Sequence, residues 1–104
     1  MTEVVFAVYV PHSGKGKELE KLVLGHSSAL RELELITDRK EIVVRSSNGS
    51  MIEVFEWRSA KAAEMAHEHP KVAKIWEAMA KVCDFGTLKS LPESEKRFPH
   101  FTPV

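Results

Sequence analysis

Five side chains in this sequence have the chemistry to bind or activate a small molecule, and His26 is the first of them. It lies between Leu22 and Leu30 in an apolar stripe that repeats every three or four residues, so we expect it to face a sheet. Imidazole exchanges protons near neutral pH, which makes His26 a candidate base for orienting or deprotonating a phenol. The alternative is a core His that is hydrogen-bonded to a backbone carbonyl.

His69 is the second candidate base. It continues the apolar stripe of a second helix, with Val72 and Trp76, and lies near a kink that Pro70 predicts. His67 lies about 200° away around that helix and is expected to point toward solvent with Lys71 and Lys74; we keep it as a further candidate for substrate binding. Two His residues at this spacing cannot chelate one metal from a regular helix, and we expect no metal site.

Two aromatic residues are candidate substrate contacts. The indole N–H of Trp76 needs a partner if the ring is buried, so it can point at a ligand; the alternative is an ordinary core Trp. Tyr9 and Phe6 lie on opposite faces of one strand, and the phenol makes Tyr9 the expected ligand contact. Arg45 and Glu53 are expected to form a structural ion pair across a hairpin.

The elements that must position these side chains follow from periodicity and turn signals. Asn48-Gly49 predicts a two-residue type I′ turn, and Ser59 is a suitable N-cap. We expect strands at 4–10, 41–47, 50–57 and 84–88, and helices at 17–35 and from 61 to about 82, the second broken at 67–70.

The resulting order, β-α-β-β-α-β, predicts an α+β, ferredoxin-like domain over residues 1–90, with two helices on one face of a four-stranded antiparallel sheet. Both faces of the strands are apolar, and the helices can cover only one of them. We therefore expect a homodimer through the sheet face. Alternatively, the Pro-containing tail, 91–104, covers this face itself, with Phe98 and Phe101 packed against the sheet. In a dimer the tail could also pack against the partner subunit.

Charge balance, the length of apolar runs and the cysteine count disfavour several classes of function. The 104 residues carry 15 Lys and Arg against 15 Asp and Glu, which disfavours nucleic-acid binding, and no apolar run is long enough to span a membrane. The N-terminus has no signal-peptide pattern, and the single cysteine, Cys83, is expected to serve in packing. We expect a cytoplasmic protein.

With this order of elements, residues 3–90 resemble the antibiotic biosynthesis monooxygenase-like family of the dimeric α/β-barrel superfamily. The resemblance is carried by the helix entry GKELE at 16–20, the strand IEVFEW at 52–57 running into Ser59, and HPKV at 69–72 leading to Ile75-Trp76. Members include cofactor-independent oxygenases of polyketide-like or quinol aromatics and haem-degrading enzymes. The haem-degrading members combine an Asn on the first strand with a Trp and a His on the second helix. Here the only Asn lies in the hairpin turn, so we expect no cofactor.

The resemblance implies a small cofactor-independent monooxygenase that holds a hydrophobic or aromatic metabolite between sheet and helices. His26 or His69 would deprotonate a substrate that becomes an electron-rich anion, beside Tyr9, Trp76 and His67. The alternatives are a binding module with the same pocket and no turnover, and a structural dimeric α/β-barrel protein whose own side chains fill the pocket.

Overall fold

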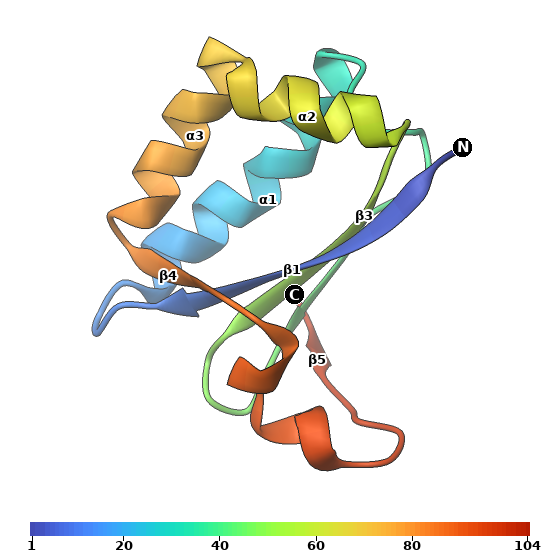
Figure 1. The fold of residues 1–104 in the computed structure, drawn as a ribbon. Coiled ribbons are helices and arrows are strands. Elements are labelled where there is room, and N and C mark those ends of the chain that lie inside the picture. The colour runs from blue at the N-terminus through green and yellow to red at the C-terminus, as the bar shows by residue number, and fades with distance from the viewer.

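The computed structural model describes all residues, 1–104, as an α+β fold with five antiparallel strands and three α-helices. The helices lie on one side of the sheet, and the C-terminal segment lies on the other (Figure 1). The strands are β1 Glu3–Pro11, β2 Ile42–Arg45, β3 Met51–Trp57, β4 Cys83–Gly86 and β5 Thr102–Pro103; the α-helices are α1 Gly16–Glu32, α2 Ala60–Glu68 and α3 Pro70–Ala80, and two short 3-10 helices are η1 Leu88–Ser90 and η2 Pro92–Glu95.

The sheet order is β4-β1-β3-β2-β5, with every neighbouring pair antiparallel. The first four strands in this order, with helices on one face, are compatible with a ferredoxin-like fold. The expected count of four strands is too low, because the tail returns to the edge of the sheet. There Pro103 pairs with Val44 and Thr102 with Arg45.

The second helical segment is divided, as the sequence predicts. Ser59 caps α2, its side chain accepting a hydrogen bond from the Ala62 N–H at 3.0 Å. His69 has extended backbone between the two helices, and Pro70 occupies the first turn of α3, where its missing N–H costs no hydrogen bond. None of the three helices is long and apolar enough to cross a membrane.

The β2–β3 connection differs from the two-residue turn expected at Asn48-Gly49. A type I′ turn needs positive φ at both residues, but only Gly49 has it, at 88°. The Gly49 N–H donates to the Ser46 carbonyl, and the Ser46 N–H donates to the Ser50 carbonyl. The loop therefore has three residues and ends on a left-handed glycine, which shifts the β2–β3 pairing by one residue.

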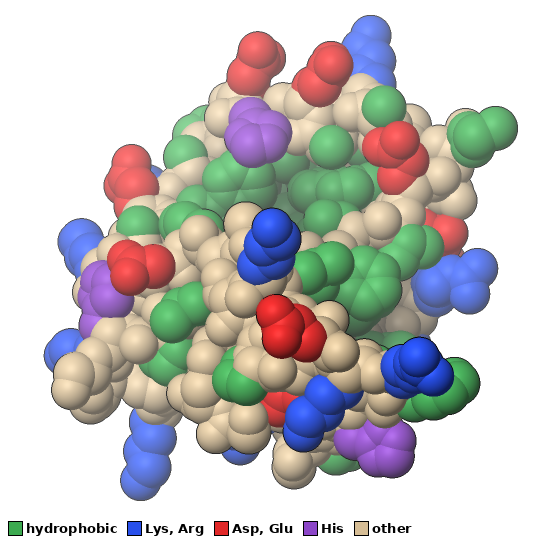
Figure 2. All heavy atoms as spheres, turned by 60° about the horizontal axis from the view of Figure 1, so that its bottom comes forward, with side chains coloured by type: hydrophobic (Ala, Val, Ile, Leu, Met, Phe, Trp, Pro, Cys, Tyr) green, Lys and Arg blue, Asp and Glu red, His purple; other side chains and the backbone are tan.

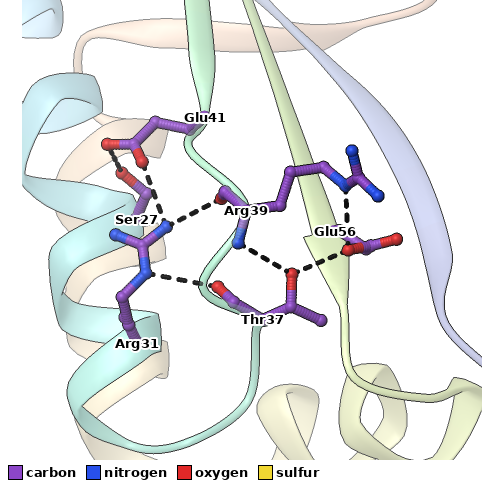
Figure 3. A network of polar contacts seen from close by, with 6 residues as sticks. All are labelled: Ser27, Arg31, Thr37, Arg39, Glu41 and Glu56. Atoms are coloured by element: carbon purple, nitrogen blue, oxygen red, sulfur yellow. Dashed lines mark hydrogen bonds and ion pairs between the residues drawn. The ribbon is translucent and has the colours of Figure 1, made fainter.

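The loop between α1 and β2 is fixed by a polar network (Figure 3). Arg31 on α1 donates to the Thr37 and Arg39 carbonyls and to Glu41, and the Ser27 hydroxyl also donates to Glu41, at 2.7 Å. On the other side Thr37 and Arg39 both donate to Glu56 of β3. These bonds hold α1, the helix that carries His26, against the sheet.

The C-terminal segment covers part of the outer sheet face, the face away from the helices. Leu91 is buried there with Val8 and Ile52, and Phe101 packs against the same cluster. Phe98, the other expected plug, is 88% exposed and does not cover the sheet; its backbone has a left-handed φ of 52°.

The tail leaves an apolar hollow on this face, which we call the outer groove, of about 400 Å³. Phe6 and Ile42 on its wall remain 57% and 60% exposed. In Figure 2 hydrophobic side chains gather in the middle of this face, with most of the charged side chains around its edge. The tail therefore covers the outer face only in part.

Candidate functional site

The helix-side pocket, a cavity of about 410 Å³, lies between the sheet and the helices. The pocket runs along the part of β1 that β4 does not cover. β4 pairs only with Val8 to Pro11, so the first half of β1 has no neighbouring strand at that edge of the sheet. The cavity has the size of a small-molecule site. Its lining is Val5, Phe6, Ala7, Val8, Tyr9, His26, Phe55, Trp57, Ala63, His67, Trp76, Phe85 and Gly86.

A buried carboxylate lies behind the polar part of this wall. Glu53, on β3, faces the helices and has no exposed surface. Its Oε1 accepts two hydrogen bonds, from the Tyr9 hydroxyl and from Nδ1 of His26, both at 2.8 Å. Its Oε2 has no partner. Because an unpaired buried charge is costly, the two donors are what make Glu53 tolerable at this position.

The tautomer of His26 follows from its neighbours. The indole N–H of Trp76 lies 3.0 Å from Nε2 and can only donate, so Nε2 must be the unprotonated acceptor. The proton is then on Nδ1, which donates to Glu53. His26 is therefore oriented by a carboxylate, with its basic nitrogen turned toward Trp76, the arrangement by which a carboxylate prepares an imidazole to act as a base.

Tyr9 serves this site as a hydrogen-bond donor. Burial raises the pKa of its phenol far above the ordinary value, and the neighbouring Glu53 raises it further. The phenol therefore keeps its proton, and Tyr9 holds Glu53 in place rather than acting as a base. Its ring also meets Phe85 edge-on, with centroids 6.0 Å apart.

Trp76 and His67 are two of the four residues that the helices supply to the pocket wall, beside His26 and Ala63. Trp76, on α3, is half-buried, and exposed His67, on α2, meets its indole edge-on with centroids 4.9 Å apart. His26 meets Phe55 in the same way, at 5.7 Å. The His26 ring thus lies against two aromatic rings, those of Phe55 and Trp76.

The structure brings together four of the five expected site residues, Tyr9, His26, His67 and Trp76, and leaves out His69. The expectation that His69 continues an inward-facing stripe is wrong, because Pro70 ends α2 and His69 leaves the helical conformation. Its Nδ1 instead accepts the Lys71 N–H at 3.1 Å and caps α3.

Glu53 is the site residue that the sequence interpretation assigned incorrectly. The expected pair with Arg45 does not form: Arg45 pairs with Glu20 of α1. The sequence does contain a signal that Glu53 is a buried charge: it is the only charged residue on the inward face of β3, between the apolar residues Met51, Phe55 and Trp57. A charged side chain among inward-facing apolar residues needs hydrogen-bond donors from inside the protein.

No group of three or more His, Cys, Asp or Glu side chains is placed to hold a metal ion. Cys83 is buried, and its pKa is raised by burial and by the neighbouring Asp84, so it is a packing residue rather than a nucleophile. No family model, no curated protein and no solved structure matches this chain. Its function therefore has to be argued from the pocket itself.

Proposed function

We propose that this protein is a small cofactor-independent monooxygenase acting on a hydrophobic aromatic metabolite with an ionisable hydroxyl group. The observation that carries the proposal is the Glu53–His26 pair at the wall of an apolar cavity of about 410 Å³. An oriented imidazole can take the hydroxyl proton, and the Glu53 carboxylate stabilises the imidazolium that forms. The apolar wall keeps water away from the electron-rich anion.

The reaction needs O₂ as its only co-reactant. The anion adds O₂ at a conjugated ring carbon that bears one hydrogen, and His26 returns its proton to the terminal peroxide oxygen. Loss of water then breaks the O–O and C–H bonds and leaves a carbonyl at that carbon. The original hydroxyl also becomes a carbonyl, so two hydrogens leave with one oxygen atom as water while the other oxygen atom stays in the product.

Oxygen uptake with a panel of quinols and fused-ring phenols tests this function. Uptake should fall by about 10²- to 10⁴-fold in His26→Ala, the effect of losing a general base. His69→Ala is the matched control, since His69 only caps α3, and uptake should stay within about twofold of wild type. No uptake by the wild type, or equal rates in wild type and His26→Ala, would remove the proposed reaction.

A non-catalytic binding protein is the second candidate, and one observation favours it. Nε2 of His26 is already occupied by the Trp76 N–H, so the base is not free in the unliganded protein. The same phenols would then bind in the helix-side pocket without consuming oxygen. Calorimetric binding measured beside oxygen uptake separates the two candidates.

We also propose that two copies associate through the outer face. Support comes from the apolar side chains that the tail leaves uncovered, among them Phe6 and Ile42, and from the outer groove between them. Contiguous apolar surface on a sheet face marks an interaction site, and a second copy with two-fold symmetry is the simplest partner.

A further inference from the structure

The hydrogen bond between Trp76 and His26 limits what can bind beside it. A neutral imidazole has one lone pair available at Nε2, and the indole N–H occupies it at 3.0 Å. Nδ1 is engaged with Glu53. No ligand can therefore use His26 as an acceptor or a base while Trp76 stays where it is.

We infer that a ligand hydroxyl opens this bond by inserting between Trp76 Nε1 and His26 Nε2, so that Trp76 sets the ligand specificity of the pocket. A hydroxyl both accepts and donates: it can take the indole N–H and give its own proton to Nε2. A carboxylate only accepts and an ammonium only donates, so each leaves one of the two nitrogens unpaired. This inference rests on the proposed function, because it takes the helix-side pocket as the ligand site.

Of the two hydrogen-bonded partners, Trp76 is the less firmly held. Insertion of an oxygen requires the two nitrogens to separate to roughly 4.5–5.5 Å, because each new N···O distance is about 2.8 Å. His26 cannot retreat, since it is buried and bonded to Glu53. Trp76 is only half-buried, and the His67 ring that it contacts is exposed, so the indole is the partner that moves.

Once displaced, the indole N–H has a second use. It points at the ligand oxygen from which His26 takes the proton, so it donates to that oxygen as negative charge develops there. A donor placed at a developing oxyanion lowers the barrier to its formation. The same Trp76 thus blocks the base in the empty pocket and stabilises the anion in the filled one.

Binding of 1-naphthol and 1-methoxynaphthalene tests the inference, because the two differ in the hydroxyl proton. The methyl ether can accept the indole N–H but has nothing to donate to Nε2. We expect the wild type to bind 1-naphthol at least about tenfold more tightly by calorimetry. In Trp76→Phe no bond has to be opened and the hydroxyl still donates to Nε2, so the affinity for 1-naphthol should stay within about threefold of wild type. A ligand that can only donate, 1-naphthylmethylammonium, should gain about tenfold, because it no longer leaves an indole N–H unpaired.

Nitrogen-15 NMR supplies a readout that does not depend on the variant folding. The chain has two Trp residues, so the indole N–H resonance of Trp76 is one of two signals. It should shift when wild-type protein is saturated with 1-naphthol, while Nδ1 of His26 stays protonated. Equal affinity of the wild type for both compounds, or an unshifted Trp76 resonance at saturation, would overturn the inference.

These outcomes separate this inference from the proposed reaction, because neither measurement needs turnover. Selective binding of 1-naphthol with no oxygen uptake on any phenol leaves Trp76 in its proposed role and removes the monooxygenase. Oxygen uptake together with unselective binding removes the role of Trp76 alone.

Discussion

Glu53 connects the two halves of the site at the scale of single residues. Its carboxylate is buried without a cationic residue beside it, and only Tyr9 and His26 donate to it. An unpaired buried polar group costs about 1–3 kcal/mol, and more if it is charged. The molecule therefore keeps Glu53 at some expense in stability, which is typical of a residue retained for a site rather than for packing.

Tyr9→Phe should lower the free energy of unfolding by about 1.5–3 kcal/mol, because it removes one of the two donors to a buried carboxylate. Urea denaturation measures the loss. The same substitution in a Glu53→Gln background should cost less, since the charge that needed the donor is gone. Equal costs in the two backgrounds would show that Tyr9 stabilises the protein by packing alone.

The sequence predicts His26 and Trp76 as site residues, but it does not predict the hydrogen bond between them. The apolar stripe of α1 predicts an inward-facing His26, and the stripe of α3 predicts an inward-facing Trp76. Which side chains then meet depends on distances between elements that are remote in the chain, such as Glu53 and His26, 27 residues apart. The prediction for His69 is wrong for a local reason. Pro70 ends α2 before His69, so His69 does not extend the apolar stripe of that helix.

At the scale of elements, the β2–β3 hairpin shows why a correct turn signal gave the wrong pairing. Asn48-Gly49 does lie at the turn, but the Asn48 side chain accepts the Ser50 N–H and donates to the carbonyl of Ser90, the last residue of η1. Glu93 also binds Ser47 N–H, so the tail takes part in shaping the loop. Contacts of this kind between distant segments cannot be read from a local motif.

Two glycine substitutions should change stability in opposite directions. Gly49→Ala should destabilise the protein by about 1–2 kcal/mol, because φ is 88° there and an L-residue is strained in that region. Gly25→Ala should stabilise it by about 0.5–1 kcal/mol, since Gly25 lies inside α1 and nothing is within 4 Å of the added methyl group. Thermal unfolding of both variants, each the control for the other, checks the signs.

The anchor of the tail should make stability depend on acid pH. Glu93 accepts hydrogen bonds from Ser46 and from the Ser47 N–H, which lower its pKa to about 2. A lowered pKa means that the anchor stabilises the fold above the ordinary carboxyl pKa, near 4.5, and loses this effect as the pH falls toward 2.

Glu93→Gln should therefore be less stable than wild type at pH 7 and should lose less stability between pH 5 and pH 2. Urea midpoints across this range measure the difference. Glu95→Gln is the control, because Glu95 is exposed, and its pH dependence should follow wild type. Hydrogen bonds from Thr37 to Glu56 and from Ser27 to Glu41 lower those pKa values as well, so some acid sensitivity should remain in Glu93→Gln.

At the scale of the whole molecule, the outer sheet face is where we propose that two copies associate. Because β1 and β3 lack the alternation of apolar and polar residues, the sequence predicts that both faces of the sheet are apolar. In the structure the tail covers part of the outer face. The tail's role was harder to predict, because a Pro-containing segment has no periodicity that would reveal Leu91 as its buried contact and Phe98 as an exposed one.

Light scattering at micromolar concentration should give roughly twice the chain mass of 11.7 kDa. Ile42→Lys, which places a charge in the outer groove, should shift the protein to the monomer mass. Leu24→Lys is the matched control, since Leu24 is 48% exposed but lies on α1, and it should leave the mass unchanged. A wild type that scatters as a single chain at every concentration would remove the dimer.

Phe6 lies on the walls of both hollows, the helix-side pocket and the outer groove. A bound phenol and a second subunit would thus both lie beside Phe6, at the part of β1 that β4 leaves unpaired. If occupancy of one hollow changes the affinity at the other, thermodynamic reciprocity requires the converse change by the same factor. The dimer fraction, followed in a dilution series with and without 1-naphthol, would report ligand binding from the far side of the sheet.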